Sequence, residues 1–287
     1  MGVNRHRRGG MGYDGRVMPP MYHLDLDAAQ IRGARVALLP GDPGRSRLIA
    51  ERIATAHGGR VAERPLASNR EFCTYLAEIA GAPVLVTSTG IGGPSTSIAV
   101  DELAQLGVTT FLRVGTTGAI QDGIALGDVV VTTGAVRLDG ASTHYAPIQY
   151  PAVAHHEVVL ALVLAAQEVG ARLGFRAHVG ITASTDTFYQ GQERQEGMPR
   201  WVPRHLQGMT EEWRRLHVLN YEMEASTLFT VASAFGRRAG CVTGVINSRV
   251  TDEARPIGPE DLRRGQEHAV QVAIRAAELL LTGALPL

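Results

Sequence analysis

Short apolar runs alternate with longer amphipathic segments along most of the chain. The runs have the length of strands, are rich in Val, Ile and Thr, and occupy residues 35–40, 83–89, 111–115, 128–133, 178–184 and 241–247. Between several of them, apolar residues recur at helical spacing over 44–56, 95–106, 155–170, 222–236 and 259–282. Near-continuous apolar strands interleaved with helices predict a sheet that is covered on both faces, which is an α/β layered fold.

Two segments depart from this pattern. Residues 1–20 hold arginines among glycines and prolines and contain no apolar run, so we expect a disordered basic arm ahead of one domain over 21–287. A true start at Met11, Met18 or Met21 is the alternative. Residues 188–217 contain several glycines and prolines and both tryptophans, which favours an insertion loop that carries functional side chains.

Composition excludes several classes of protein. The 28 basic and 28 acidic side chains balance, so the chain lacks the charge excess that is typical of nucleic-acid binders. Cys73 and Cys241 are too few for a disulfide framework or a zinc cluster, which favours a reduced cytoplasmic protein. No apolar stretch approaches the roughly 20 residues that span a bilayer, so we expect no membrane association.

Three glycine-rich segments follow apolar runs directly: Gly41–Arg45, Gly90–Ser95 and Gly115–Gly118. Glycine lets backbone N–H groups approach a ligand closely, and arginine offers a planar fork that suits phosphate oxygens. Arg45 and Arg113 lie in or beside two of these segments. The pattern predicts three turns that build an anion site beyond the strand ends, where α/β folds usually bind ligands.

Two further segments carry candidate chemistry. In Asn220–Ser226, two acids stand one residue apart, and on a strand only one of them could readily face a given pocket. A carboxylate there could hold the vicinal hydroxyls of a sugar, although an acid at a helix start has a simple electrostatic explanation too. In Phe188–Arg194, Gln192 and Arg194 share a side if the segment is extended, and they could read an amide-like ring such as uracil beside Phe188. A solvated polar loop is the alternative.

Metal and nucleophilic chemistry find little support. His155 and His156 are adjacent, so they do not share a helix face, and with His144 they are interpreted as surface or helix-start residues. Ser95 and Ser97 lack the Gly-x-Ser-x-Gly pattern of a nucleophile elbow. We therefore expect no resident metal ligand set of histidines and no covalent enzyme intermediate.

Several of these motifs occur together and in order between about His23 and Arg249: GDPGR, NREF, STGIGGPSTSIA, FLRVGTTGAI, VRLDGAS, DTFYQGQER and NYEMEAS. Taken together they resemble the uridine phosphorylases of the nucleoside phosphorylase-I family. The resemblance implies a single-domain three-layer α/β/α sandwich with a central mixed, barrel-like sheet. It also implies phosphorolysis of uridine to uracil and ribose 1-phosphate, with inorganic phosphate as co-substrate and no organic cofactor, in a hexamer built as a trimer of dimers.

The resemblance also implies roles for individual residues. Those implied to bind phosphate are Gly41, Arg45, Arg70, Arg113 and Thr116. Those implied to bind ribose are His23, Met223 and Glu224. Those implied to bind the base are Thr117, Gly118, Phe188, Gln192, Arg194, Ile246 and Arg249. The implied catalytic group is Arg113, Glu224, Arg194 and Gln192, while Arg70 and His23 are expected to act in a neighbouring subunit's site. Glu71, Ile91 and Ser95 match the place where some relatives hold potassium.

The chain departs from the family pattern at two points. Gln190 stands where the uridine branch carries proline, and Ser248 aligns with the aspartate that protonates a leaving purine. Ser248 therefore argues against a purine or broad-specificity phosphorylase. The arginines argue against a nucleosidase, because water needs no cationic cradle, and the retained Glu224 argues against a non-catalytic nucleoside-binding protein.

Overall fold

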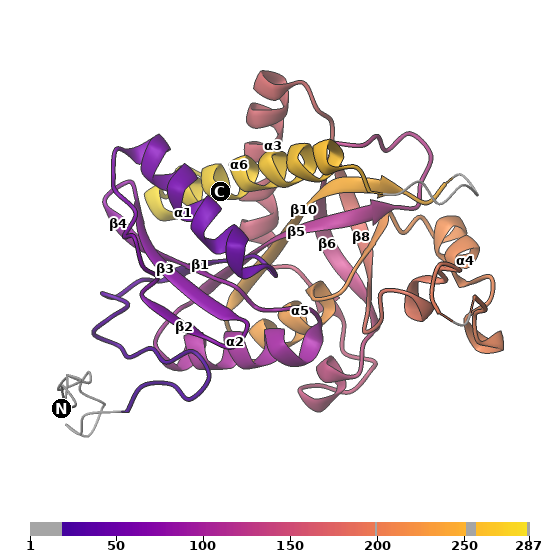
Figure 1. Ribbon diagram of the computed structural model, residues 1–287, viewed down its shortest axis with the longest axis horizontal. Helices are drawn as coiled ribbons and strands as arrows, with labels where there is room; N and C mark the ends of the chain where they lie inside the picture. The colour runs from indigo at the N-terminus through magenta and orange to yellow at the C-terminus, as the bar shows by residue number, and fades with distance from the viewer. Residues whose placement is uncertain (1–18, 199, 251–256, 286–287) are drawn as a thin grey trace.

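The computed structural model describes residues 19–198, 200–250 and 257–285. Apart from its last two prolines, the expected N-terminal arm lies outside these residues. The described chain forms three layers, with a mixed sheet between two layers of helices (Figure 1). The α/β/α expectation is confirmed. In the described part of the chain, no helix is long and apolar enough to cross a membrane.

The central sheet has two parts that share one strand. The strands are β1 (Val36–Leu39), β2 (Ala67–Asn69), β3 (Phe72–Ile79), β4 (Ala82–Thr87), β5 (Thr110–Ala119), β6 (Val129–Leu138), β7 (Ala152–Val153), β8 (Ala177–Thr185), β9 (Asn220–Glu222) and β10 (Arg238–Ser248). β10, β6, β8, β9 and β5 pair in a closed ring, which is the expected barrel-like part. β1, β4, β3 and β2 extend from β5 as an open sheet.

Helices cover both faces of the sheet. On one face lie α1 (Pro43–His57), α3 (His156–Leu173) and α6 (Pro259–Thr282), and on the other lie α2 (Gly93–Gln105) and α5 (Ala225–Ala234) (Figure 1). The short α4 (Met209–Arg215) lies beside the barrel end. All six apolar runs predicted as strands are strands, and each of the five predicted helices is present, although α5 begins at Ala225.

Burial on both faces explains why the central strands have continuous apolar sequences. In β1, Val36 and Leu38 pack into the core under α1, α3 and α6. Ala37 and Leu39 face the other way and pack into the core under α2 and α5. Successive strand residues point to opposite faces, so a strand between two cores has no polar face.

The sequence pattern missed some elements and mistook one. β2, β3, β7, β9 and α4 were not expected, because they are short or carry polar residues among the apolar ones. The segment Gly115–Gly118 is no turn, since it lies inside β5 and continues the pairing with β10 as far as Ala119. Residues 188–217 hold α4 and two short 3-10 turns, one of them η2 (Gln190–Gln192), rather than one irregular loop.

α6 approaches β10 so closely that neither backbone leaves room for a side chain. A Cβ built on Gly244 would lie 1.8 Å from the carbonyl oxygen of Gly265. Because that obstacle is helix backbone, we expect Gly244→Ala to lower the free energy of unfolding by about 3 kcal/mol through overpacking. Gly59→Ala is the matched control, because its Cβ would meet only an ordinary contact at 4.0 Å. Chemical denaturation of both variants checks this, and equal midpoints would contradict it.

Candidate active site

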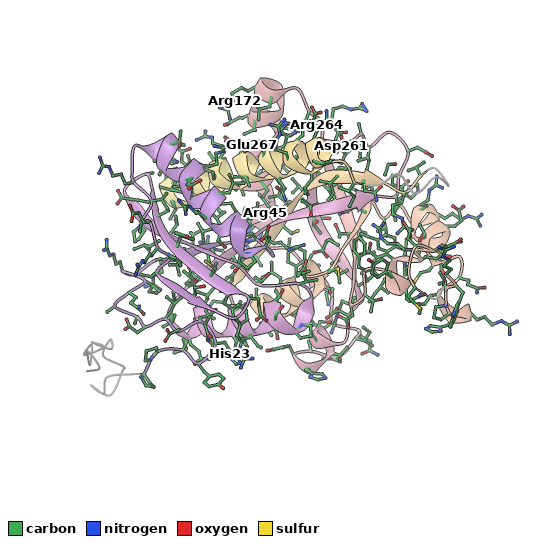
Figure 2. The ribbon with its side chains drawn as sticks, viewed as in Figure 1. His23, Arg45, Arg172, Asp261, Arg264 and Glu267 are labelled. Carbon is green, nitrogen blue, oxygen red and sulfur yellow. The ribbon has the colours of Figure 1, made fainter. Side chains whose placement is uncertain are left out.

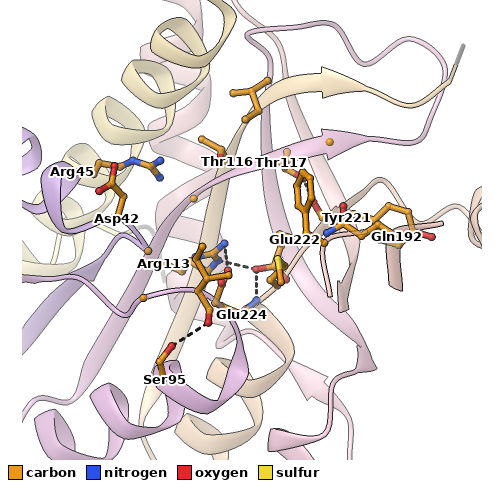
Figure 3. Close-up of a pocket in the computed structure, with 18 of the residues that line it drawn as sticks. Asp42, Arg45, Ser95, Arg113, Thr116, Thr117, Gln192, Tyr221, Glu222 and Glu224 are labelled. Atoms are coloured by element: carbon orange, nitrogen blue, oxygen red, sulfur yellow. Dashed lines mark hydrogen bonds and ion pairs between the residues drawn. The ribbon is translucent and has the colours of Figure 1, made fainter. Parts of the chain in front are cut away.

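A cavity of about 850 Å³ lies where the carboxyl ends of several strands meet. Loops after β1 and β4, the second half of β5, and residues from β9 and β10 line it. Of the residues implied by the family resemblance, those that line it are Gly41, Arg45, Glu71, Ile91, Ser95, Arg113, Thr116, Thr117, Gly118, Phe188, Gln192, Arg194, Met223, Glu224 and Ile246. Figure 3 shows Arg45 at one end, Gln192 at the other, and Arg113 with Glu224 between them.

The first turn of α1 forms a cationic end of this cavity. Asp42 caps α1 by accepting a hydrogen bond from Gly44 N at 2.9 Å, so Arg45 projects from a fixed helix start. Burial lowers the pKa of Arg45, while the carboxylate of Asp42 opposes this change. Nε of Arg45 is buried and has no hydrogen-bond partner among the described residues. A buried donor beside a helix N-terminus is suited to bind an anion.

Arg113 lies at the centre of the cavity between two buried carboxylates. Its Nε donates to Glu222 Oε2 at 2.8 Å, and its Nη2 forms an ion pair with Glu224. Burial alone would lower the pKa of Arg113, but Glu224 and then Glu222 raise it above its ordinary value. Burial raises the pKa of the Glu224 carboxyl, and Arg113 opposes that effect. The cluster stays compact because Gly115 has no side chain, since a Cβ there would lie 2.9 Å from Arg113 Nη2.

The expectation that only one of the two acids faces the site is wrong. β9 ends at Glu222, so Glu224 is not on a strand but is the N-cap residue of α5. The chain therefore turns between them, and both carboxylates reach Arg113. Glu222 also accepts hydrogen bonds from Ser184 Oγ and from the backbone N–H groups of Glu224 and Ala225. Glu222 thus fixes Arg113 and the start of α5 together.

Glu224 is held in the cavity wall from the side of α2 as well. Its Oε1 accepts a hydrogen bond from Gly92 N at 2.6 Å, directly ahead of α2. With Arg113 on its other oxygen, the carboxylate has little rotational freedom. A carboxylate fixed in this way can accept hydrogen bonds from a ligand without first being ordered, which lowers the entropic cost of binding.

The other end of the cavity carries amide-reading groups. Gln192 and Arg194 are both buried, and Arg194 Nε lies 3.4 Å from Gln192 Oε1. Their segment is not extended as expected, because residues 190–192 form η2 and Glu193 adopts a left-handed φ of 54°. This turn brings the two side chains together. Burial and then the charge of Arg249 lower the pKa of Arg194 to about 10, so its guanidinium still carries its charge at neutral pH.

Phe188 and Thr117 complete this end. The Arg194 guanidinium lies over the Phe188 ring at 4.1 Å, a cation–π contact that orients both groups. Thr117 Oγ1 donates to the carbonyl of Tyr221 at 2.6 Å and accepts from Asn220 Nδ2 at 2.6 Å. Because its only proton is already donated, the Thr117 hydroxyl can offer a ligand an acceptor and not a donor.

A bulge at Ile246 and backbone hydrogen bonds from Arg249 shape this end of the cavity. β10 contains a register shift between Val245 and Asn247, so Ile246 is the extra residue of a bulge and lines the cavity. Arg249 does not line the cavity. It instead donates to the carbonyl oxygens of Gln192 at 2.6 Å and Glu193 at 3.3 Å, so it holds the turn that presents Gln192 and Arg194.

Three of the implied site residues lie outside the cavity lining: Arg70, His23 and Arg249. Arg70 is exposed in the turn between β2 and β3. His23 lies at the edge of the molecule, well apart from Arg45 (Figure 2). Ser248 does not line the cavity either, whereas its neighbour Asn247 does. Among the residues that the structure describes, no cluster of His, Cys, Asp and Glu could hold a metal ion.

Comparison with known proteins places this site in a family. A profile of the phosphorylase superfamily matches residues 35–283, which is most of the chain. The chain belongs to the phosphorylase superfamily. It is 51% identical to uridine phosphorylase of Escherichia coli over 91% of this chain and 98% of that protein. It is 45% identical to uridine phosphorylase of Thermococcus kodakarensis, over 90% of this chain and 86% of that protein. Guanosine phosphorylase of Halorubrum lacusprofundi is 34% identical over 90% of this chain and 98% of that protein.

Among the residues of this phosphorylase-superfamily site, sequence reasoning gave no role to Glu222, Tyr221 and Asn247. The first could have been found from the segment Asn220–Ser226, had a chain reversal between its two acids been considered. Tyr221 and Asn247 carry no comparable signal, because a tyrosine in a strand is often a partly buried packing residue and an asparagine is most often solvent-exposed.

Proposed function

We propose that this chain catalyses the reversible phosphorolysis of uridine to uracil and ribose 1-phosphate. The observation that carries the proposal is the order of groups along one cavity: a cationic end at Arg45, the fixed carboxylate of Glu224, and the pair Gln192 and Arg194. Phosphate, ribose and uracil follow one another in the same order in the reacting complex. The names of the relatives above support the same substrate class.

In this proposal the phosphate lies against Gly41, Arg45, Arg113 and Thr116, on the face of the sugar opposite the base. A phosphate oxygen forms a bond to the anomeric carbon as the bond from that carbon to uracil breaks. The bonding electron pair leaves with uracil. As the sugar becomes positive and the base negative, the phosphate held below the sugar stabilises the first charge, and the donors of Arg194 and Gln192 stabilise the second.

Glu224 accepts hydrogen bonds from the ribose hydroxyls, and Met223 lies beside the sugar. Arg194 and Gln192 donate to the departing uracil next to Phe188, Thr117, Gly118 and Ile246. Arg249 acts on the base through the turn that it holds, since its guanidinium contacts the carbonyls of that turn. The site needs no covalent enzyme intermediate.

Assembly belongs to the proposal as well. Arg70 and His23 lie outside their own chain's cavity, which supports their expected use in a neighbouring subunit. We propose a hexamer of three dimers in which Arg70 reaches the neighbour's phosphate and His23 reaches the 5′-hydroxyl of the neighbour's ribose. We also propose a potassium ion at Glu71, Ile91 and Ser95, and a cytoplasmic location.

Release of uracil from uridine, followed by absorbance with and without inorganic phosphate, tests the proposal. We expect release only with phosphate, and none or very little cleavage of inosine and guanosine. Release without phosphate would indicate a hydrolase and contradict the role of Arg45. Preferential cleavage of guanosine would instead place the activity with the guanosine phosphorylase relative and contradict the role of Gln192 and Arg194.

A further inference from the structure

Glu102 is a buried acid of α2 that the proposed chemistry does not use. Its two oxygens accept hydrogen bonds from the backbone N–H groups of His23 at 3.0 Å and Leu24 at 2.8 Å. Its Oε1 also lies 2.7 Å from Nδ1 of the His23 ring. Burying a carboxylate costs free energy unless hydrogen bonds compensate it, so these three contacts are what stabilise Glu102 in the interior.

The contact defines the tautomer of His23. Because both oxygens of Glu102 already accept from backbone N–H groups, the carboxylate acts as the acceptor and the ring proton lies on Nδ1. The other ring nitrogen, Nε2, is then the one left for a ligand. In serine hydrolases a carboxylate orients a histidine in the same way, and the tautomer is what it controls.

His23 is tied to Arg70 through a neighbouring turn. The carbonyl oxygen of His23 accepts a hydrogen bond from Asn69 Nδ2 at 2.9 Å. Asn69 pairs with Phe72 across the turn between β2 and β3, so Arg70 lies in that turn. The His23 ring is also edge-on to Phe72, with ring centroids 6.3 Å apart. The two residues that are expected to enter a neighbouring site therefore belong to one packed unit.

We propose that Glu102 is a positioning residue for catalysis in the neighbouring subunit. It holds the ring of His23 with Nε2 outward, so that this nitrogen meets the 5′-hydroxyl of the bound nucleoside across the subunit boundary. The proposal rests on the proposed function, because it requires His23 to reach a neighbour's ribose. Glu102 never touches substrate, and its whole effect passes through His23.

Uridine and 5′-deoxyuridine separate this role from a structural one, because only uridine carries the 5′-hydroxyl. We expect Glu102→Gln to lower kcat/KM for uridine roughly tenfold, which is about the effect of losing one hydrogen bond. The kcat/KM for 5′-deoxyuridine should stay nearly unchanged. His23→Ala should show the same selectivity, and adding Glu102→Gln to it should cause no further loss. Asp101→Asn, next to Glu102 on α2, is the matched control and should leave kcat/KM for both substrates unchanged.

The outcomes are distinguishable. If His23→Ala lowers kcat/KM equally for both substrates, or for neither, the proposed role of His23 is wrong and this proposal is overturned with it. If His23→Ala is selective but Glu102→Gln is not, Glu102 is a structural residue and only this proposal is overturned. Nitrogen-15 NMR of the wild-type protein measures the tautomer without any change to Glu102. The signals of His23 are assigned by comparison with the spectrum of His23→Ala. The wild-type spectrum should show the proton on Nδ1, and a proton on Nε2 alone would overturn the proposal.

Discussion

Replacing Arg194 with alanine should lower uridine turnover by roughly 10²- to 10³-fold, the loss commonly seen when one preorganised donor to a developing charge is removed. Arg194 is buried beside Gln192 and faces the end of the cavity opposite Arg45. Its removal should therefore leave the KM for phosphate nearly unchanged. Steady-state kinetics with each substrate varied in turn will measure both effects.

Arg204→Ala is the control for Arg194→Ala. Arg204 is exposed and belongs to the same inserted segment, so its loss removes an equal charge without touching the cavity. We expect it to leave turnover unchanged. A comparable rise in the KM for phosphate in the Arg194 variant would show that the two ends of the cavity are not separate in function.

Replacing Arg113 with alanine should lower the free energy of unfolding by about 3–5 kcal/mol, in addition to abolishing turnover. Arg113 pairs with Glu222 and Glu224, and all three side chains are buried. Its removal leaves two carboxylates in the interior without their cation. Urea denaturation followed by circular dichroism will measure the change.

Two further variants identify the cause of that loss. Adding Glu222→Gln and Glu224→Gln to Arg113→Ala removes the uncompensated charges, so part of the lost stability should return. Arg47→Ala removes an arginine from an exposed ion pair with Glu51 and should leave the midpoint of unfolding almost unchanged. If the triple variant were less stable than Arg113→Ala, lost packing rather than buried charge would be responsible.

The sequence was sufficient to predict the layers and the strands that are buried on both faces, because such strands have continuous apolar runs. β3 escaped prediction because it is an antiparallel strand with polar residues such as Thr74 and Glu78 among its apolar ones. Gly115–Gly118 was mistaken for a turn because glycine serves turns and close approaches equally well. Here it serves a close approach, that of the Arg113 guanidinium to its own strand.

The site could be predicted residue by residue only where a family motif covered it. The motif correctly brought Gln192 and Arg194 together, but their assumed extended backbone was wrong, since the left-handed φ of Glu193 has no clear sequence signal. The position of Ile246 depends on a bulge in the pairing with β5, where Thr117 and Gly118 pair with Val245 and Asn247, which are far away in the chain. Neither local propensity nor periodicity contains such information.

β5 is the only described strand that pairs with both the open extension and the closed ring. Four cavity residues follow one another along it: Arg113, Thr116, Thr117 and Gly118. Because a strand rises roughly 3.3 Å per residue, their positions along the cavity are fixed by the strand itself. In the proposed reaction, the spacing between the phosphate contacts Arg113 and Thr116 and the base contacts Thr117 and Gly118 is thereby set by one strand rather than by loops. A lineage could replace the base-reading segment after β8 and accept a different nucleobase while the reacting distances stayed constant. A constant spacing of this kind agrees with the existence of relatives that are named for uridine and for guanosine.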